Sequence, residues 1–369
     1  ELSNSILITE MCENYNILSA PKFPKFECPG GKKEIEYLKE LCEEGFKKLD
    51  KDKDPIVYRE RLELELKVIE EANLSGYFLI VWDIINFLRE NNKMTPLGRG
   101  SAAGCLVSYL TGIVGIDPIE HDLMFERFYN ASRAGSLPDI DIDVPSEFRD
   151  EVIEYIKKKY GEKHVCQMAT FGSLMGRSAV KEVLRVEGEL GFAEINEMTE
   201  HIPDESEIAD ELENMEDKSI ILWSLQNRPK KFERWCTLNE DGTLGGPYAE
   251  SFGRAMKMEG TYKSQGKHAA GVIISSDIIE DVCPIVIDKH DKAVAAFSMK
   301  PMEALGHIKF DVLGVSVMDK IWEIVPFLPE GRSIHDMKDQ DVWKDLSEGD
   351  VKGVFQLELQ KRWTKKLKP

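Results

Sequence analysis

The stretch Pro138-Asp139-Ile140-Asp141-Ile142-Asp143 alternates carboxylates with isoleucines. This period of two predicts a β-strand over Leu137–Val144, because successive side chains of a strand point to opposite faces. The isoleucines then pack into a core, and the three aspartates crowd together on the other face. Like charges this close repel each other, and a divalent cation relieves the repulsion. Ligands that are all oxygen favour Mg²⁺, Mn²⁺ or Ca²⁺.

Two other interpretations of this stretch stay open. A solvated edge strand also tolerates a row of exposed carboxylates. The aspartates also stand at positions 1, 3 and 5 of a calcium-binding EF-hand loop. Against that loop, Val144 stands where it needs glycine, and Asp150 replaces its terminal glutamate.

A second motif is the turn Gly98-Arg99-Gly100-Ser101-Ala102-Ala103-Gly104, which we expect to open a helix of small residues. Glycines let backbone N–H groups approach a ligand, and a helix N-terminus favours anions. Ser101 adds a hydroxyl group and Arg99 a positive charge, so the turn is a candidate phosphate site. It is not a P-loop, because it has no Gly-Lys-Ser/Thr. Its loose GxGxxA pattern also fits a dinucleotide-binding turn, and its small residues also fit a tight helix crossing.

Charged residues also stand in the motifs Gly266–Gly271 and Lys309–Gly314. In the second motif, Lys309 and Asp311 share one face of a predicted strand, with Phe310 in the core. Asp311 is a candidate metal ligand and Lys309 a candidate phosphate contact, although a surface Lys–Asp pair is the commoner reason for this spacing. Together the motifs supply carboxylates for two cations and a turn and lysines for phosphates. Such a set suits phosphoryl or nucleotidyl transfer with two metal ions.

The composition of the 369 residues excludes several classes of protein. Hydrophobic residues make up 42% and charged residues 31%, which excludes a disordered chain, a collagen-like fibre and a small disulfide scaffold. The most apolar run, 77–88, is too short to span a membrane. A net charge of −19 argues against coating nucleic acid by bulk charge, but it permits a local basic track. The seven cysteines are scattered and form no CxxC motif, which predicts that the protein is located in the reducing cytoplasm.

Periodicity and turn residues predict the remaining elements. We expect strands at 165–170, 271–274 and 307–311, a helical tail from 320, and helices at 33–49, 55–72, 77–90, 147–160 and 178–186. Segment 187–217 has thirteen acidic residues and no lysine or arginine, whereas 228–267 has eight basic and five acidic residues. This shift in composition predicts a separate helical insertion over about 172–260.

These motifs resemble those of the C-family replicative polymerases, the family of the bacterial DNA polymerase III alpha subunit. The resemblance covers almost the whole chain, in motif order and approximate spacing. The matching stretches are Gly76–Asp83, Gly98–Gly104, Phe125–Asn130, Pro138–Asp143, Thr170–Gly172, Gly266–Gly271, Lys309–Gly314 and Gly353–Glu358. The resemblance implies an α+β fold, with a polymerase-β-like nucleotidyltransferase palm over 1–171 and 261–319. It also implies an inserted helical thumb over 172–260 and the start of the fingers over 320–369.

The resemblance also implies roles for single residues. Asp139 and Asp141 would be the paired ligands of two Mg²⁺ ions, for which Mn²⁺ can substitute, with Asp311 as third carboxylate and Asp143 as accessory member. The residues implied to contact the nucleotide or the DNA are Gly100, Ser101 and Lys309 at the triphosphate, Arg127 in the nucleotide pocket, and Lys267 and His268 near the primer strand or triphosphate. The implied partners are primer–template DNA, deoxynucleoside triphosphates and, in the full-length protein, a sliding clamp and other replisome subunits.

The chain departs from the family pattern in several places. It starts at Glu1 without an initiator methionine or signal peptide, as expected of a cut fragment, and it contains no amino-terminal phosphoesterase-like domain and only the start of the fingers. Segment 133–137 is one residue longer than usual, and 187–217 is very acidic for a thumb. The basic stretch 228–267, with Lys230 and Lys231, could grip DNA instead, or form a solvated helical face.

Two alternative functions stay open at this point. One is a catalytically silent module for DNA binding or assembly, in which the carboxylates are merely ancestral. The other is a dinucleotide-dependent oxidoreductase built on Gly98–Ala103.

Overall fold

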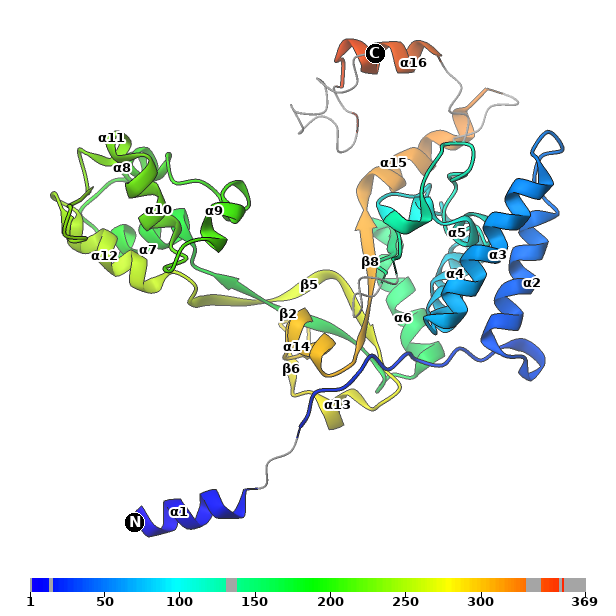
Figure 1. Cartoon of the computed structure of the whole chain (residues 1–369), viewed down its shortest axis with the longest axis horizontal. Coiled ribbons are helices and arrows are strands. Elements are labelled where there is room, and N and C mark those ends of the chain that lie inside the picture. Colours follow the sequence, from blue (N-terminus) through cyan, green and yellow to red (C-terminus); the bar gives the residue numbers. More distant parts are fainter. Residues whose placement is uncertain (1, 13–15, 131–137, 330–339, 352–353, 355–369) are drawn as a thin grey trace. The chain divides into compact units, whose positions relative to one another are not determined.

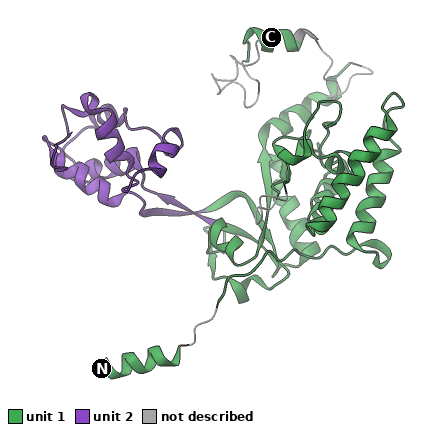
Figure 2. Ribbon diagram, viewed as in Figure 1, with its two compact units in different colours: residues 1–168, 267–369 green, residues 169–266 purple. Residues whose placement is uncertain are grey.

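The computed structural model describes residues 2–12, 16–130, 138–329, 340–351 and 354. The chain forms two compact units (Figure 2). Unit 2 consists of Ala169–Gly266, and unit 1 consists of the segments on either side of it. The insertion predicted over 172–260 lies within unit 2. Its role as a thumb stays a prediction, as do the domain boundaries taken from the resemblance.

A six-stranded mixed sheet lies mainly in unit 1, and the predicted α+β class is confirmed (Figure 1). Strand β1 pairs in parallel with β8, and β5 pairs with β8 on the other side in the antiparallel direction. Strand β7 pairs in parallel with β2 and antiparallel with β6. In spatial order the strands are β1 (Asp141–Pro145), β8 (Ile308–Val315), β5 (Tyr262–Ile274), β2 (Val165–Ser173), β7 (Ala293–Ala295) and β6 (Ile285–Ile287).

The first half of unit 1 is helical. Its α-helices are α1 (Leu2–Met11), α2 (Glu34–Phe46), α3 (Pro55–Glu71), α4 (Ser75–Glu90), α5 (Leu106–Leu110) and α6 (Arg149–Tyr160). Helix α3 begins where its sequence predicts, because the Asp54 side chain accepts a hydrogen bond from the backbone N–H of Ile56 and Pro55 takes the first turn. Helix α4 is the central core helix, and eleven of its sixteen residues are buried.

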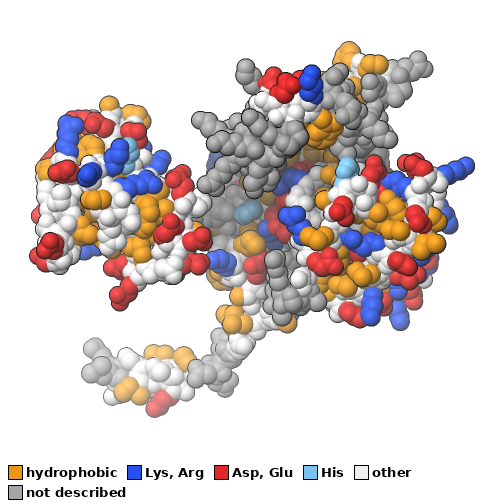
Figure 3. Space-filling model, turned by 45° about the horizontal axis from the view of Figure 1, so that its top comes forward, with side chains coloured by type: hydrophobic (Ala, Val, Ile, Leu, Met, Phe, Trp, Pro, Cys, Tyr) orange, Lys and Arg blue, Asp and Glu red, His pale blue; other side chains and the backbone are white. Residues whose placement is uncertain are grey.

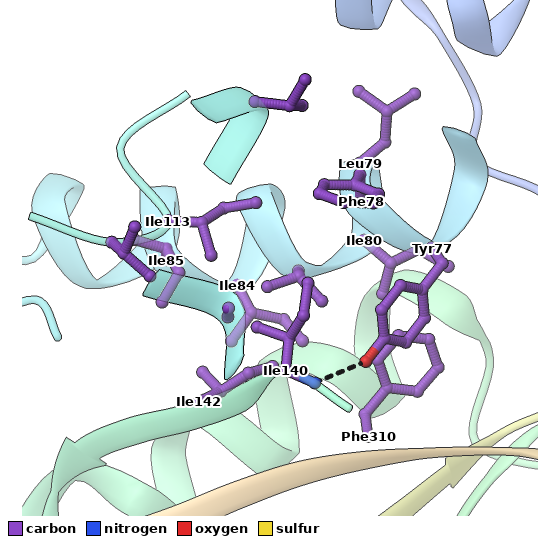
Figure 4. Close-up of a cluster of buried hydrophobic side chains, with 14 of the residues drawn as sticks. Tyr77, Phe78, Leu79, Ile80, Ile84, Ile85, Ile113, Ile140, Ile142 and Phe310 are labelled. Carbon is purple, nitrogen blue, oxygen red and sulfur yellow. Dashed lines mark hydrogen bonds between the residues drawn. The ribbon is translucent and has the colours of Figure 1, made fainter. Parts of the chain in front are cut away.

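The main core of unit 1 lies between these helices and strands β1 and β8. Figure 4 shows Tyr77 and Ile84 of α4 facing Ile140, Ile142 and Phe310 of the sheet side. All five residues are at most 3% exposed. The last elements of unit 1 are α13 (Ile279–Val282), α14 (Met299–Ala304), α15 (Ser316–Ile324) and α16 (Gln340–Glu348).

Unit 2 has its own hydrophobic core. Its elements are α7 (Gly176–Glu187), α8 (Phe192–Thr199), α9 (Ala209–Glu213), α10 (Ile220–Asn227), α11 (Pro229–Phe232), the hairpin β3 (Thr237–Leu238) and β4 (Leu244–Gly245), and α12 (Ala249–Met258). The half-buried carboxylate of Glu259 accepts hydrogen bonds from Ser219 and from the backbone N–H groups of Gly176 and Ile221. Glu259 therefore holds the starts of α7 and α10 together.

The expected strands are present, and so are the helices expected over 33–49, 55–72, 77–90, 147–160 and 178–186, although several elements differ in length. The strand expected over 137–144 begins only at Asp141, so Asp139 precedes it. The strand expected over 271–274 is part of the longer β5, which starts at Tyr262. The small-residue helix expected from Ala102 is wrong. A 3₁₀ turn spans Ser101–Gly104, and the extended backbone of Cys105 separates it from α5. Of the matching stretch Gly353–Glu358, only Val354 belongs to the described residues.

None of the helices in the described part of the chain combines the length and the apolar character needed to cross a bilayer.

Candidate active site

Three aspartates from two distant parts of the chain meet at the edge of the sheet in unit 1. The parallel pairing of β1 with β8 places Asp141 directly beside Asp311, although about 170 residues separate them. Asp139 lies two residues before Asp141. One carboxylate oxygen from each of the three residues lies within 4.8 Å of the other two. The structure therefore brings together the three carboxylates that the resemblance implies as metal ligands.

A buried apolar layer supports this cluster from behind. Ile140 and Ile142 alternate with the aspartates and are at most 1% exposed. The Oη atom of Tyr77 accepts a hydrogen bond from the backbone N–H of Ile140 at 3.0 Å (Figure 4). The Tyr77 ring stacks on Phe310, with 5.2 Å between the ring centroids. Sequence reasoning missed the role of Tyr77, because an aromatic residue in an apolar helix gives no local sign of its partner.

Two basic side chains contact the aspartates. Arg99 donates to both oxygens of Asp143, with 2.8 Å from Nε to Oδ2 and 3.0 Å from Nη2 to Oδ1. Its Nη1 atom lies 3.0 Å from Oδ2 of Asp141. The Nζ atom of Lys309 lies 2.5 Å from Oδ2 of Asp311. Arg99 and Lys309 thus neutralise two of the four carboxylates, which leaves two formal negative charges.

The environment makes the carboxyl groups of Asp139 and Asp141 harder to ionise than free aspartate, because it raises the pKa of both. Burial raises the pKa of Asp139, and the nearby Asp311 adds to this rise, whereas Lys309 opposes it. Burial also raises the pKa of Asp141, against the effect of Arg99. Burial lowers the pKa of Lys309. Its hydrogen bond to Asp311 and the charges of the nearby carboxylates raise that pKa and together outweigh the effect of burial, so the net shift is upward. A cation bound here would favour the ionised carboxylates and displace protons.

The residues present fit a hard divalent ion. The ligand atoms are all carboxylate oxygens, which Mg²⁺ and Mn²⁺ prefer. The Oδ1 atom of Asp311 is buried and has no hydrogen-bond partner among the described residues. A buried carboxylate oxygen without a partner is costly, and a cation would satisfy it. Asp143 has both oxygens on Arg99, so Asp139, Asp141 and Asp311 are the better ligands.

The glycine-rich turn lies directly beside this cluster. Gly100 has a φ of +67°, which glycine adopts without strain, and a Cβ atom there would lie 3.4 Å from Oδ2 of Asp141. Ser101, half-buried, begins the short 3₁₀ turn. The predicted helix N-terminus is absent at this point. The groups that remain as predicted phosphate contacts are the turn's own N–H groups, the Ser101 hydroxyl group and Arg99.

The alternatives for these motifs can now be judged. The calcium-loop interpretation is wrong, because Asp141 and Asp143 lie in a strand that pairs with β8. β1 is indeed an edge strand, but one face of it is buried. The dinucleotide interpretation needs a strand before Gly98, and the described residues 91–97 form none. A close backbone approach does occur at Gly104, where a Cβ atom would lie 2.8 Å from the carbonyl oxygen of Met124.

The remaining predicted contacts have other partners or are exposed. Lys267 pairs with Asp288 at 3.2 Å. Nδ1 of His268 accepts hydrogen bonds from the backbone N–H groups of Gly271 at 2.6 Å and Ala270 at 3.2 Å, so this ring is turned to its own strand. Arg127 is exposed at the end of a 3₁₀ turn over Phe125–Arg127.

Lys230 and Lys231 belong to unit 2, on the short helix α11. Both side chains are exposed, and neither forms an ion pair with another described residue. On the face of unit 2 drawn in Figure 3, lysine and arginine side chains lie among acidic ones. The basic character of 228–267 is therefore local, and the two lysines remain predicted DNA contacts.

The fold and the cluster define an α+β protein with a carboxylate centre suited to divalent cations. Residues 36–314 match the family model of the Bacterial DNA polymerase III alpha NTPase domain. This match covers well over half of the chain, and the chain belongs to that family of replicative DNA polymerases.

Curated relatives agree with this assignment, and each is named DNA polymerase III subunit alpha. The protein of Bacillus subtilis strain 168 is 36% identical over 376 residues, which cover 100% of this chain and 32% of the relative. The protein of Aquifex aeolicus strain VF5 is 33% identical, covering 98% of this chain and 32% of the relative. The protein of Staphylococcus aureus strain COL is 35% identical, covering 98% and 33%. The chain thus spans about a third of the length of the curated relatives it matches.

Proposed function

We propose that this chain is part of the catalytic core of a DNA-directed DNA polymerase. In this proposal unit 1 contains the nucleotidyltransferase palm, unit 2 is the thumb, and the fingers begin at residue 320. The substrates are a primer–template and deoxynucleoside triphosphates, and the longer cytoplasmic protein would meet a sliding clamp and other replisome subunits. The observation that carries the proposal is the convergence of Asp139, Asp141 and Asp311 within 4.8 Å.

Asp139, Asp141 and Asp311 would hold two Mg²⁺ ions, or Mn²⁺ in their place. When bound, such ions stabilise negative charge on phosphate and favour ionisation of a primer 3′-hydroxyl group. The chain's own residues orient the nucleotide around them. The backbone at Gly100 and the hydroxyl group of Ser101 would contact the triphosphate.

Arg99 and Lys309 would exchange carboxylate partners for phosphate. Both now neutralise aspartates of the cluster, at 2.5–3.0 Å. With cations held by the aspartates, Arg99 and Lys309 would no longer be needed to neutralise these carboxylates and would be free to bind triphosphate oxygens. Arg127, exposed and without an ion pair among the described residues, would contact the nucleotide from a second loop.

Calorimetric titration of the chain with Mn²⁺ tests this proposal. We expect Asp141→Asn and Asp311→Asn to weaken Mn²⁺ binding by more than about tenfold, because each removes one charged oxygen ligand. Asp277→Asn is the matched control. Asp277 also lies in unit 1, but it does not belong to the cluster, and its Oδ2 atom lies 2.9 Å from Nζ of Lys22. Equal Mn²⁺ affinity in the wild type and in both cluster variants would refute the metal site.

Primer extension distinguishes an enzyme from the silent module. The wild-type chain, or the full-length protein that contains it, should extend a primer with Mg²⁺ present. Asp141→Asn in the same protein should abolish extension. Metal binding with no extension by the full-length protein would favour the silent DNA-binding module instead.

A further inference from the structure

We infer that Arg61 and Glu65 of α3 are positioning residues that set the spacing between two nucleotide-binding segments. The inference rests on the proposed function and extends it to two residues outside the predicted site. One segment is the turn with Gly100 and Ser101. The other is the loop that leads to Arg127.

Glu65 is fully buried and fixes the chain just after the turn. Its Oε2 atom accepts hydrogen bonds from the backbone N–H of Val107 at 3.0 Å and from the Cys105 thiol at 3.3 Å. Its Oε1 atom accepts a hydrogen bond from Nε of Arg61 at 2.6 Å. Both carboxylate oxygens are therefore in use, as a buried charge requires.

Arg61 connects the two segments with one guanidinium group. Residues 61 and 65 share a face of α3, because they are four positions apart. The Nη2 atom of Arg61 donates to the carbonyl oxygen of Gly104 at 3.0 Å and to that of Leu123 at 3.1 Å. Gly104 ends the 3₁₀ turn that Ser101 begins, and Leu123 lies just before the turn that ends in Arg127.

The two segments also meet directly at this point. A Cβ atom at residue 104 would lie 2.8 Å from the carbonyl oxygen of Met124, so only glycine permits this approach. The planar fork of arginine binds two acceptors in a fixed geometry, which a lysine does not reproduce. The distance between Ser101 and Arg127 thus depends on a side chain that touches neither nucleotide nor metal.

Equilibrium binding of a fluorescent deoxyadenosine triphosphate analogue, with Mn²⁺ present, tests this role. We expect Arg61→Gln to weaken nucleotide binding about tenfold, the effect of losing one hydrogen bond to a charged group. Arg61→Lys keeps the charge beside Glu65 and provides a second variant should Arg61→Gln fold poorly, and it should weaken binding in the same direction. Mn²⁺ binding without nucleotide should be unchanged in both variants, because the three aspartates are not touched.

Asp83→Asn is the matched control, because Asp83 is a buried carboxylate of α4 that accepts hydrogen bonds from Tyr155 and Tyr160. It should leave nucleotide affinity unchanged. Hydrogen exchange should increase at 98–105 and 123–128 in the Arg61 variants but not in Asp83→Asn. Wild-type nucleotide affinity in both Arg61 variants, or equal weakening in Asp83→Asn, would overturn the inference and leave the proposed function intact. Failure of the wild-type chain to bind the analogue would overturn the proposed function and this inference with it.

Discussion

Replacing Tyr77 by phenylalanine removes one oxygen atom from the support of the aspartate cluster. That atom accepts the hydrogen bond of the Ile140 N–H at 3.0 Å, and this backbone group lies between Asp139 and Asp141. The ring itself remains, and so does its stacking on Phe310 at 5.2 Å. The substitution therefore tests the hydrogen bond without creating a cavity.

The magnitude follows from the burial of the N–H group. Ile140 is 1% exposed, so water does not replace the lost acceptor. Leaving a buried donor unsatisfied costs about 1–3 kcal/mol, and we expect the free energy of unfolding of unit 1 to fall by that amount. Asp139 lies outside β1, and we expect this hydrogen bond to help hold it in position. Mn²⁺ affinity should therefore also fall. Each 0.65 kcal/mol of lost binding free energy corresponds to a fall of about threefold.

Native-state hydrogen exchange of the β1 and β8 amides measures this loss for unit 1 separately from unit 2. Calorimetry measures the Mn²⁺ affinity. Tyr155→Phe is the control, because the Tyr155 hydroxyl group contacts both oxygens of Asp83 at 3.0 Å, away from the cluster. It should lower stability without changing Mn²⁺ binding. A Tyr77→Phe protein with wild-type stability and wild-type Mn²⁺ affinity would refute the reasoning.

Two further predictions concern pH and salt. His307 is 3% exposed, and burial lowers its pKa, so below pH 6.5 the unfolded chain takes up a proton that the folded chain resists. Unit 1 should therefore lose stability as the pH falls through this range, by at most about 1.4 kcal/mol per pH unit. His307→Asn should remove this dependence of the unfolding free energy on pH. Denaturant titrations from pH 7.5 to 5 that give the wild type and His307→Asn the same dependence would contradict this assignment. In unit 2, Lys230→Glu with Lys231→Glu should weaken binding to duplex DNA and reduce the salt slope by about two, as measured by fluorescence anisotropy, and an unchanged slope would leave both lysines as surface residues.

The local structure around the aspartates could be predicted from the sequence. Alternation of aspartate and isoleucine determines which side chains are buried, because the period of a strand is two. The helices α3 and α4 follow likewise from the Asp54-Pro55 start and from a long apolar run. The family could also be recognised, because its motifs are spread over most of the chain.

The assembly of the cluster could not be derived from local patterns. No periodicity connects Asp141 to Asp311. That they act together was inferred from the chemistry of the combined motifs and from the resemblance. The Arg61 bridge escaped notice for a similar reason, because its acceptors are carbonyl groups, which every residue has. The extent of β5 was underestimated because its first half, from Tyr262, is exposed and polar and lacks the apolar run that marks its second half.

The parallel pairing of β1 with β8 has a consequence for synthesis of the protein. The loop between Asp141 and Asp311 spans about 170 residues, and closing it costs chain entropy before the contacts between β1 and β8 can stabilise the pairing. Such long-range pairing forms late and slowly in folding. On the ribosome, the first two aspartates must wait until the whole of unit 2 has been translated before their third partner emerges. A nascent chain interrupted anywhere before β8 therefore cannot assemble the complete cluster of three carboxylates.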